Sequence, residues 1–174
     1  MGIQFETDYN METLTAMAKG LRKTVRKKRS RRVHIFAAVV LIFGLLTILA
    51  TTAGGEPPSA SGVVTLLAML VVILVSLFED KLNAWFARKR LLPGTEHAAA
   101  TFEEDGYVSA TGVTESRFSY AQIVAVAETA RYFVFALSSH HTQAYDKRTI
   151  RGGSVEDFRA FIAEKTGKLV ENIK

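Results

Sequence analysis

The stretches Val33–Ala53, VHIFAAVVLIFGLLTILATTA, and Gly62–Phe78, GVVTLLAMLVVILVSLF, decide the fold class of this 174-residue chain. Neither contains an Asp, Glu, Lys or Arg residue. As a helix the first stretch would be about 31 Å long, which matches the hydrocarbon thickness of a bilayer. The second reaches spanning length if its helix continues through Glu79–Phe86 as an interfacial extension. We therefore predict transmembrane helices at residues 33–53 and 62–86.

The segment between them, residues 54–61, has the sequence GGEPPSAS and contains no Lys or Arg. Its glycines and prolines end the first helix and predict a short loop. The outer flanks are basic, with nine cations between Lys19 and Arg32 and four more at Lys81, Arg88, Lys89 and Arg90. The positive-inside rule then places both ends in the cytoplasm and the loop outside. Aromatic and basic residues after the second span are predicted interfacial anchors: Trp85, Arg88, Lys89 and Arg90.

A cleaved signal peptide is the alternative interpretation of the first apolar stretch. The small residues of Ala50–Ala53 would suit a cleavage site. The region before the stretch is, however, long for a signal peptide, and a second apolar stretch follows at once. A membrane hairpin is therefore the preferred interpretation.

The N-terminal segment, residues 1–32, carries a net charge of +6, from nine cations and three acidic residues. Gly2–Thr7 alternates like a short strand. Apolar residues at helical spacing then predict one amphipathic helix running into the first span, with Asp8 or Asn10 as its cap. The cations on its other faces are candidate contacts for anionic lipid: Arg22, Lys23, Arg26, Lys27 and Arg29. The alternative is that these charges only set topology and solubility. Nucleic acid is not a predicted partner, because no aromatic residues interleave with the cations.

The C-terminal region, residues 94–174, reads as a small α+β domain. Strand patterns separated by turn residues occur at Ala98–Glu103, Tyr107–Thr111, Val113–Phe118, Ile123–Glu128, Tyr132–Leu137 and Gln143–Tyr145. A helix follows from Ser154, with Asp157 at capping-box spacing, an apolar face that includes Leu169, and Gly167 as a stop signal. This order predicts a small antiparallel β-barrel or sandwich closed by a C-terminal helix.

Several of these segments together resemble the YcxB-like family of bacterial membrane proteins. The resemblance lies in Phe102–Gly106, Phe118–Ile123, Glu128, Tyr132–Leu137, Asp146–Arg148 and Ser154–Phe161. Asp146 departs from the pattern, since members often have proline there. The resemblance implies a two-span hairpin with a C-terminal domain of pleckstrin-homology-like fold, and it implies that the N-terminal strand joins the sheet of that domain. It implies no activity, so no catalytic residues are carried over.

Motifs for chemistry are sparse. The absence of cysteine excludes disulfides, thiolate metal sites and cysteine nucleophiles. His140-His141 lacks a third ligand at suitable spacing, and no serine-hydrolase elbow or phosphate-binding glycine loop occurs, so no metal or cofactor is predicted. The spans carry no acidic or basic residue that would suit transport. Cations near the C-terminal helix are candidate contacts for anionic lipid or a partner, or belong to a solvated loop: Lys147, Arg148 and Arg151.

The sequence thus predicts a non-enzymatic protein of the bacterial cytoplasmic (inner) membrane, multi-pass, with both termini cytoplasmic. Its partners would be the bilayer, anionic lipid, and an unidentified protein or a second copy of the chain, bound through the pleckstrin-homology-like domain. One alternative is an immunity-type membrane protein that protects against a secreted toxin. Another is a membrane enzyme with its site around Lys147, Arg148 and Arg151.

Overall fold

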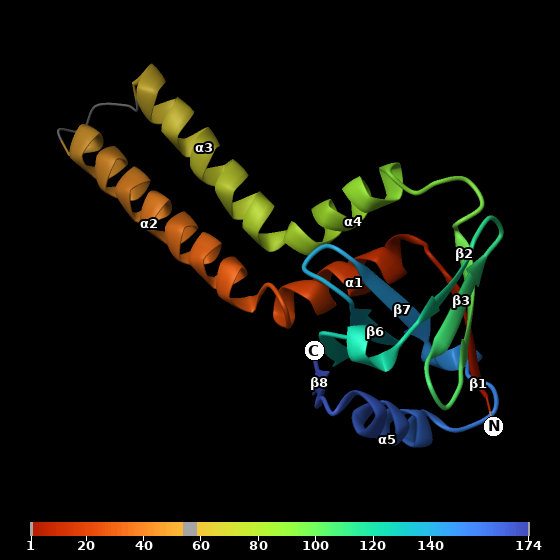
Figure 1. Ribbon diagram of the computed structural model, residues 1–174. Coiled ribbons are helices and arrows are strands. Elements are labelled where there is room, and N and C mark those ends of the chain that lie inside the picture. Colours follow the sequence, from red (N-terminus) through yellow and green to blue (C-terminus); the bar gives the residue numbers. More distant parts are fainter. Residues whose placement is uncertain (1, 54–58, 174) are drawn as a thin grey trace. The chain divides into compact units, whose positions relative to one another are not determined.

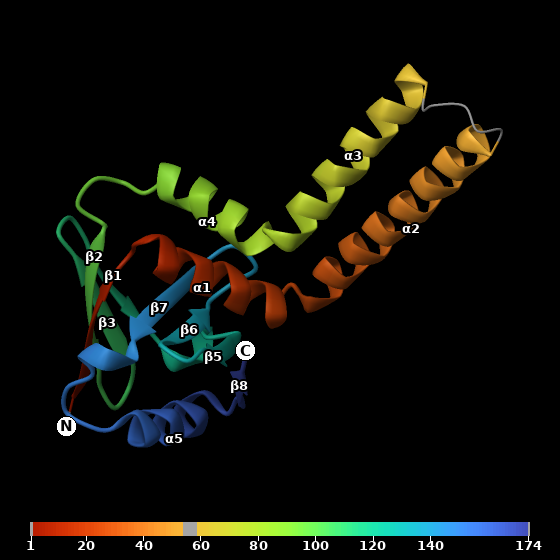
Figure 2. The same ribbon diagram turned by 180° about the vertical axis from the view of Figure 1, so that it is seen from behind.

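The computed structural model describes residues 2–53 and 59–173 (Figure 1, Figure 2). The chain forms two structural units. The α+β unit comprises Met1–Lys27 and Asn83–Lys174, and the hairpin unit comprises Lys28–Leu82. The hairpin unit is therefore inserted, in sequence, into the α+β unit. Of the predicted loop at 54–61, residues 54–58 lie outside the described part of the chain.

The first sheet of the α+β unit is antiparallel in the order β1-β2-β3-β4. Its strands are β1 (Ile3–Asp8), β2 (His97–Phe102), β3 (Tyr107–Thr111) and β4 (Glu115–Phe118). The pairing of β1 with β2 runs from Ile3 opposite Phe102 to Asp8 opposite His97. This pairing joins segments on either side of the hairpin unit, and it confirms that the N-terminal strand joins the sheet.

The second sheet has the order β7-β6-β5-β8. Its strands are β5 (Ala125–Glu128), β6 (Tyr132–Ala136), β7 (Thr142–Asp146) and β8 (Val170–Asn172), with short 3-10 helices at η1 (Tyr120–Gln122) and η2 (Lys147–Thr149). Strand β8, which the sequence pattern did not predict, runs parallel to β5. Among the described residues no strand ladder joins the two sheets, so the barrel alternative is wrong and the sheets remain separate layers.

One aromatic core lies between the two sheets and helix α5 (Val155–Thr166). Phe102 of β2 meets Tyr145 of β7 and Phe158 of α5 edge to face, with ring centroids 5.1 and 4.8 Å apart. The predicted capping box is present, since the Ser154 hydroxyl accepts from the Asp157 N–H at 3.0 Å. The helix stops at Gly167, which has a φ of +63°.

Leu169 was expected on the apolar face of that helix, and this expectation is wrong. The left-handed turn at Gly167 ends α5, so Leu169 lies beyond the helix with 87% of its surface exposed. The spacing of apolar residues predicts which residues share a helix face, but it does not show where a glycine ends the helix.

Strand β6 is buried on both faces. Phe133 and Phe135 face the aromatic core, while Tyr132 and Val134 face a second cluster under α1 (Met11–Lys23). Figure 2 shows α1 lying across β6 and β7. The contact is close, because a Cβ placed on Gly20 of α1 would come within 2.7 Å of Val134 Cγ1. The second sheet is therefore a middle layer between α1 and the aromatic core.

The expected single helix from the N-terminal arm into the first span is wrong. Helix α1 ends at Lys23, and α2 (Lys27–Thr52) begins after a break. At the break, Thr24 has a ψ of −92°, and its N–H and hydroxyl both donate to the Gly20 carbonyl, at 3.0 and 2.8 Å. The bond from the Thr24 N–H is the last regular helical bond, since the Arg26 N–H donates to the Leu21 carbonyl at 2.9 Å and the Lys27 N–H to the Thr24 carbonyl at 3.3 Å.

Helices α2 and α3 (Ala60–Leu77) are long and apolar enough to cross a membrane. The predicted continuous helix over 62–86 is wrong, because α3 ends at Leu77 and α4 (Glu79–Lys89) begins after Phe78. The acidic pair Glu79 and Asp80 occupies the first turn of α4, where negative charge complements the helix dipole. Within the hairpin unit, Gly44 of α2 lies against Met69 of α3.

Glu128 is a buried carboxylate that ties β5 to η2 and α5. It accepts from Lys147 Nζ at 2.9 Å and from Arg159 Nε and Nη2 at 2.7 and 2.8 Å. The hydrogen bonds from Arg159, with those from Lys147, hold the pKa of Glu128 below its ordinary value, against the opposing effect of burial. The ionised form is therefore the one that stabilises this corner of the unit.

We predict that Gly20→Ala destabilises the protein although alanine favours helix formation by about 1 kcal/mol. The added methyl must displace Val134, and overpacking of this kind costs about 1–3 kcal/mol. Chemical denaturation of the detergent-solubilised protein measures the change. The double variant Gly20→Ala/Val134→Ala should lose less stability than the sum of the single variants, and strict additivity would contradict the contact.

We predict that Glu128→Gln lowers the free energy of unfolding by about 3 kcal/mol at pH 7, because Lys147 keeps its charge in a site where it is only 13% exposed. A depressed folded-state pKa stabilises the fold above the unfolded value, about 4.3, and this contribution is lost as the pH falls through the folded pKa. The difference between variant and wild type should therefore shrink below about pH 4. The control is Glu156→Gln, whose carboxylate meets Arg159 on the surface and should change stability by less than about 1 kcal/mol.

Candidate membrane-contact site

The structure places the two predicted groups of cations toward opposite ends of α1. Glu12, in the first turn of α1, pairs with Arg131, which also pairs with Asp146 beside η2. Arg22 and Lys23 lie in the last turn, ten residues further along, which corresponds to about 15 Å of helix. Within the α+β unit, Arg22 and Lys23 of the α1–α2 basic group (Arg22, Lys23, Arg26, Lys27 and Arg29) therefore do not form one site with the η2 basic group (Lys147, Arg148 and Arg151).

The η2 basic group is engaged in internal ion pairs. Lys147 meets Glu128, Arg148 Nη2 lies 3.0 Å from Asp146, and Arg151 Nη1 lies 3.4 Å from Glu6. Asp146 also caps η2 by accepting from the Arg148 N–H at 3.1 Å, which gives this aspartate a local structural role. Lys147 is the least exposed of the three, and its ion pair with Glu128 stabilises the fold rather than offering a charge to a surface contact.

The α1–α2 basic group lies around the break between the two helices. Arg26 Nε donates to the Ser139 carbonyl at 2.6 Å and so fastens the break to the β6–β7 turn. Lys27 and Arg29 are exposed in the first turn of α2, which contains no acidic residue. Cations at the positive end of a helix dipole are unfavourable unless an anion lies nearby. This arrangement suits an anionic surface.

Helix α4 carries the predicted anchors on an exposed face. Trp85 is 44% exposed, its ring meets that of Phe86 at 4.9 Å, and Lys89 Nζ lies 3.6 Å from its centroid. Arg88 and Arg90 are exposed as well, whereas Ala84 is fully buried. An aromatic ring with an apolar body and a cation above it suits the headgroup region of a bilayer.

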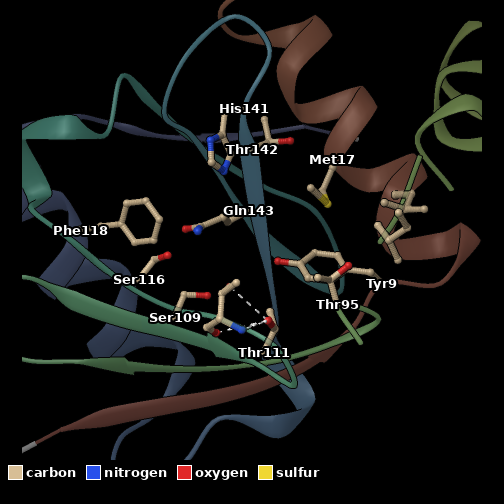
Figure 3. Close-up of a pocket in the computed structure, with 13 residues that line it drawn as sticks. Tyr9, Met17, Thr95, Ser109, Thr111, Ser116, Phe118, His141, Thr142 and Gln143 are labelled. Carbon is tan, nitrogen blue, oxygen red and sulfur yellow. Dashed lines mark hydrogen bonds between the residues drawn. The ribbon is translucent and has the colours of Figure 1, made fainter. Parts of the chain in front are cut away.

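The α+β unit contains a cleft of about 320 Å³ between α1, the first sheet and β7, which we did not predict from the sequence (Figure 3). Its polar lining includes Ser109 of β3 and Gln143 of β7. Both occupy positions where strand alternation places core residues, and both are buried. The signal in the sequence that could have predicted the cleft is the presence of polar residues at strand positions that normally hold core residues.

The histidines make local contacts. His97 Nδ1 lies 2.8 Å from Asp8 on the surface, and His140 Nδ1 lies 2.7 Å from the Ser139 hydroxyl. Within residues 2–53 and 59–173, no group of three or more His, Cys, Asp or Glu residues is arranged to hold a metal ion.

Comparison with known proteins gives one match, to a family. No curated protein and no solved structure matches the chain. Residues 102–162, from the last residue of β2 to Ile162 of α5, match the model of the YcxB-like protein family. The matched region contains β3–β7, both 3-10 helices and most of α5. The family resemblance seen in the sequence is thereby confirmed: the α+β unit of this chain carries a YcxB-like region.

Proposed function

We propose that this chain is an integral protein of the bacterial inner membrane that crosses the bilayer with α2 and α3 and keeps both ends in the cytoplasm. Its α+β unit, of pleckstrin-homology-like type, is a non-enzymatic binding module held at the membrane surface. The observation that carries the proposal is the pair of apolar helices with cations on their outer flanks only. The family match supports a membrane protein and brings no established activity.

The strand pairing of the α+β unit supports an even number of crossings. Strand β1 precedes the hairpin unit and β2 follows it, yet the two are hydrogen-bonded along six residue pairs. Both ends of the hairpin unit must therefore emerge on the same side of any membrane that it enters. Two spanning helices satisfy this requirement, and one alone does not.

The charge distribution supports the cytoplasmic side. Nine cations precede the apolar part of α2, and three more, Arg88, Lys89 and Arg90, follow at the end of α4. The connecting segment 54–61 contains none. Because cytoplasmic flanks are enriched in Lys and Arg, this asymmetry favours an orientation with both ends inside.

Anionic headgroups are the proposed contact of these flanks. Each cation close to an anionic surface contributes about 1 kcal/mol. The α1–α2 basic group and the cations of α4 adjoin the two apolar helices in sequence, so both groups would lie at headgroup depth. The η2 basic group is left out of this contact, since its charges face Glu128, Asp146 and Glu6.

We predict that single cysteines in this cysteine-free chain report the orientation directly. Ser61→Cys, at the start of α3, should react with a membrane-impermeant maleimide in intact spheroplasts. His140→Cys and Glu171→Cys, both exposed on the α+β unit, should react only after the membrane is permeabilised. The reverse pattern would overturn the orientation, and labelling of all three in intact spheroplasts would overturn the membrane span.

We predict that Trp85, the only tryptophan, lies at headgroup depth. In reconstituted protein, lipids brominated near the headgroup should quench its fluorescence more strongly than lipids brominated near the chain end. Anionic bromolipid should quench more than zwitterionic bromolipid, and Arg88→Gln/Arg90→Gln should weaken this preference by roughly fivefold per cation removed. The matched control, Arg117→Gln/Lys168→Gln, removes two cations elsewhere on the α+β unit and should leave the preference unchanged.

A further inference from the structure

We propose that the cleft between α1, the first sheet and β7 is a binding site for a small uncharged molecule that presents a carbonyl oxygen beside an apolar group, such as an amide or an ester. The proposal names a ligand class for the binding module described above, and it does not depend on the side of the membrane that the module occupies. It rests on a buried amide, an uncharged polar lining and an apolar wall.

The buried amide belongs to Gln143, whose surface is only 7% exposed. Its Oε1 accepts from the hydroxyls of Tyr107 and Tyr145, at 2.7 and 2.8 Å. Burial raises the pKa of both tyrosines, so the two hydroxyls stay protonated as donors. With Oε1 occupied, Nε2 is left as the free end of the amide, and none of the described residues accepts a hydrogen bond from it. Figure 3 shows the side chain reaching from β7 toward Phe118.

The polar lining around this amide carries no Asp, Glu, Lys or Arg. It is formed by hydroxyl groups from both sheets and by the imidazole of His141, and Figure 3 shows the hydroxyls of Ser109 and Ser116 beside Gln143. Tyr9 also lines the cleft, and burial raises its pKa to about 12, so this phenol is neutral too. An ion entering such a site would lose hydration without meeting a carboxylate, an ammonium or a guanidinium group, which disfavours phosphates, carboxylates and ammonium groups.

The apolar wall is supplied by Leu14 and Met17 of α1, by Leu91, and by Phe118 of β4. The volume, about 320 Å³, lies at the low end of ligand pockets. A carbonyl oxygen that enters the cleft would accept from Gln143 Nε2, which carries two N–H donors. A short apolar substituent would then fill the space beside Met17 and Phe118.

The test uses the full chain in detergent micelles, labelled with carbon-13 at the methionine methyl groups. Met17 lines the cleft, while Met69 lies in the hairpin unit and reports partition of the probe into the micelle. Titration with N-acetyl-leucine amide should shift the Met17 methyl signal saturably and leave Met69 unchanged. The carboxylate N-acetyl-leucine, which has the same skeleton and one negative charge, should shift Met17 at least tenfold more weakly.

Two variants locate the contact. Gln143→Glu keeps an acceptor for both tyrosine hydroxyls but removes the N–H donors, and Ser116→Phe fills the cleft from an exposed position on β4. Each should weaken binding of the amide at least tenfold. If Gln143→Glu fails to fold, the binding measured with Ser116→Phe tests the contact instead.

The proposal is overturned if the amide does not shift Met17, if it shifts Met17 and Met69 alike, if the carboxylate binds equally well, or if Ser116→Phe binds as the wild type does. None of these results bears on cysteine labelling, so the two proposals fail separately.

Discussion

The burial of β6 on both faces is the constraint on which the rest of the structure depends. One face needs Phe5 of β1 and Phe158 of α5 to complete the aromatic core, and the other needs α1 with its glycine at the point of closest approach. Both β1 and α1 come from the first 27 residues, and the remaining partners come from the last 92. The α+β unit therefore has no complete core until segments on both sides of the hairpin unit meet. The hairpin is consequently an insertion within a domain rather than a leader ahead of one.

Much of this unit could be predicted where local pattern and tertiary structure agree. The strand at Tyr132–Leu137 showed apolar residues on both faces, and the structure buries both. Ser154 and Gly167 act at the two ends of α5 because capping and left-handed turns are local effects. Strand β8 could not be predicted in this way, since a segment of three residues is too short to show an alternating pattern. Its pairing with β5 depends on the position at which the chain leaves α5.

The breaks at Thr24–Arg26 and Phe78 were missed for a related reason. Neither contains a proline or a glycine, and the helical periodicity continues through both. Helix α1 ends where the Arg26 N–H donates to the Leu21 carbonyl instead of the carbonyl four residues before it, a change of backbone bonding that hydropathy does not show. The residues of the candidate site also divide into those that the sequence identifies and those that only the structure places. The sequence could identify cations, but only the structure shows that each cation of η2 pairs with an acidic residue, and that Lys147 alone among them is nearly buried. The cleft depends on three elements distant in sequence.

The pairing of β1 with β2 also has a consequence for biosynthesis. Residues 2–27 are made before the hairpin and carry an apolar face, including Leu14 and Leu21, whereas the strands on which α1 packs, β6 and β7, are made after it. In the proposed membrane topology, a basic amphipathic segment would until then lie next to a nascent membrane helix, and such segments rest in the headgroup region. Completion of the domain would then draw this segment off the lipid and onto the sheet. Under that proposal, release from the bilayer and closure of the core form a single late step in maturation.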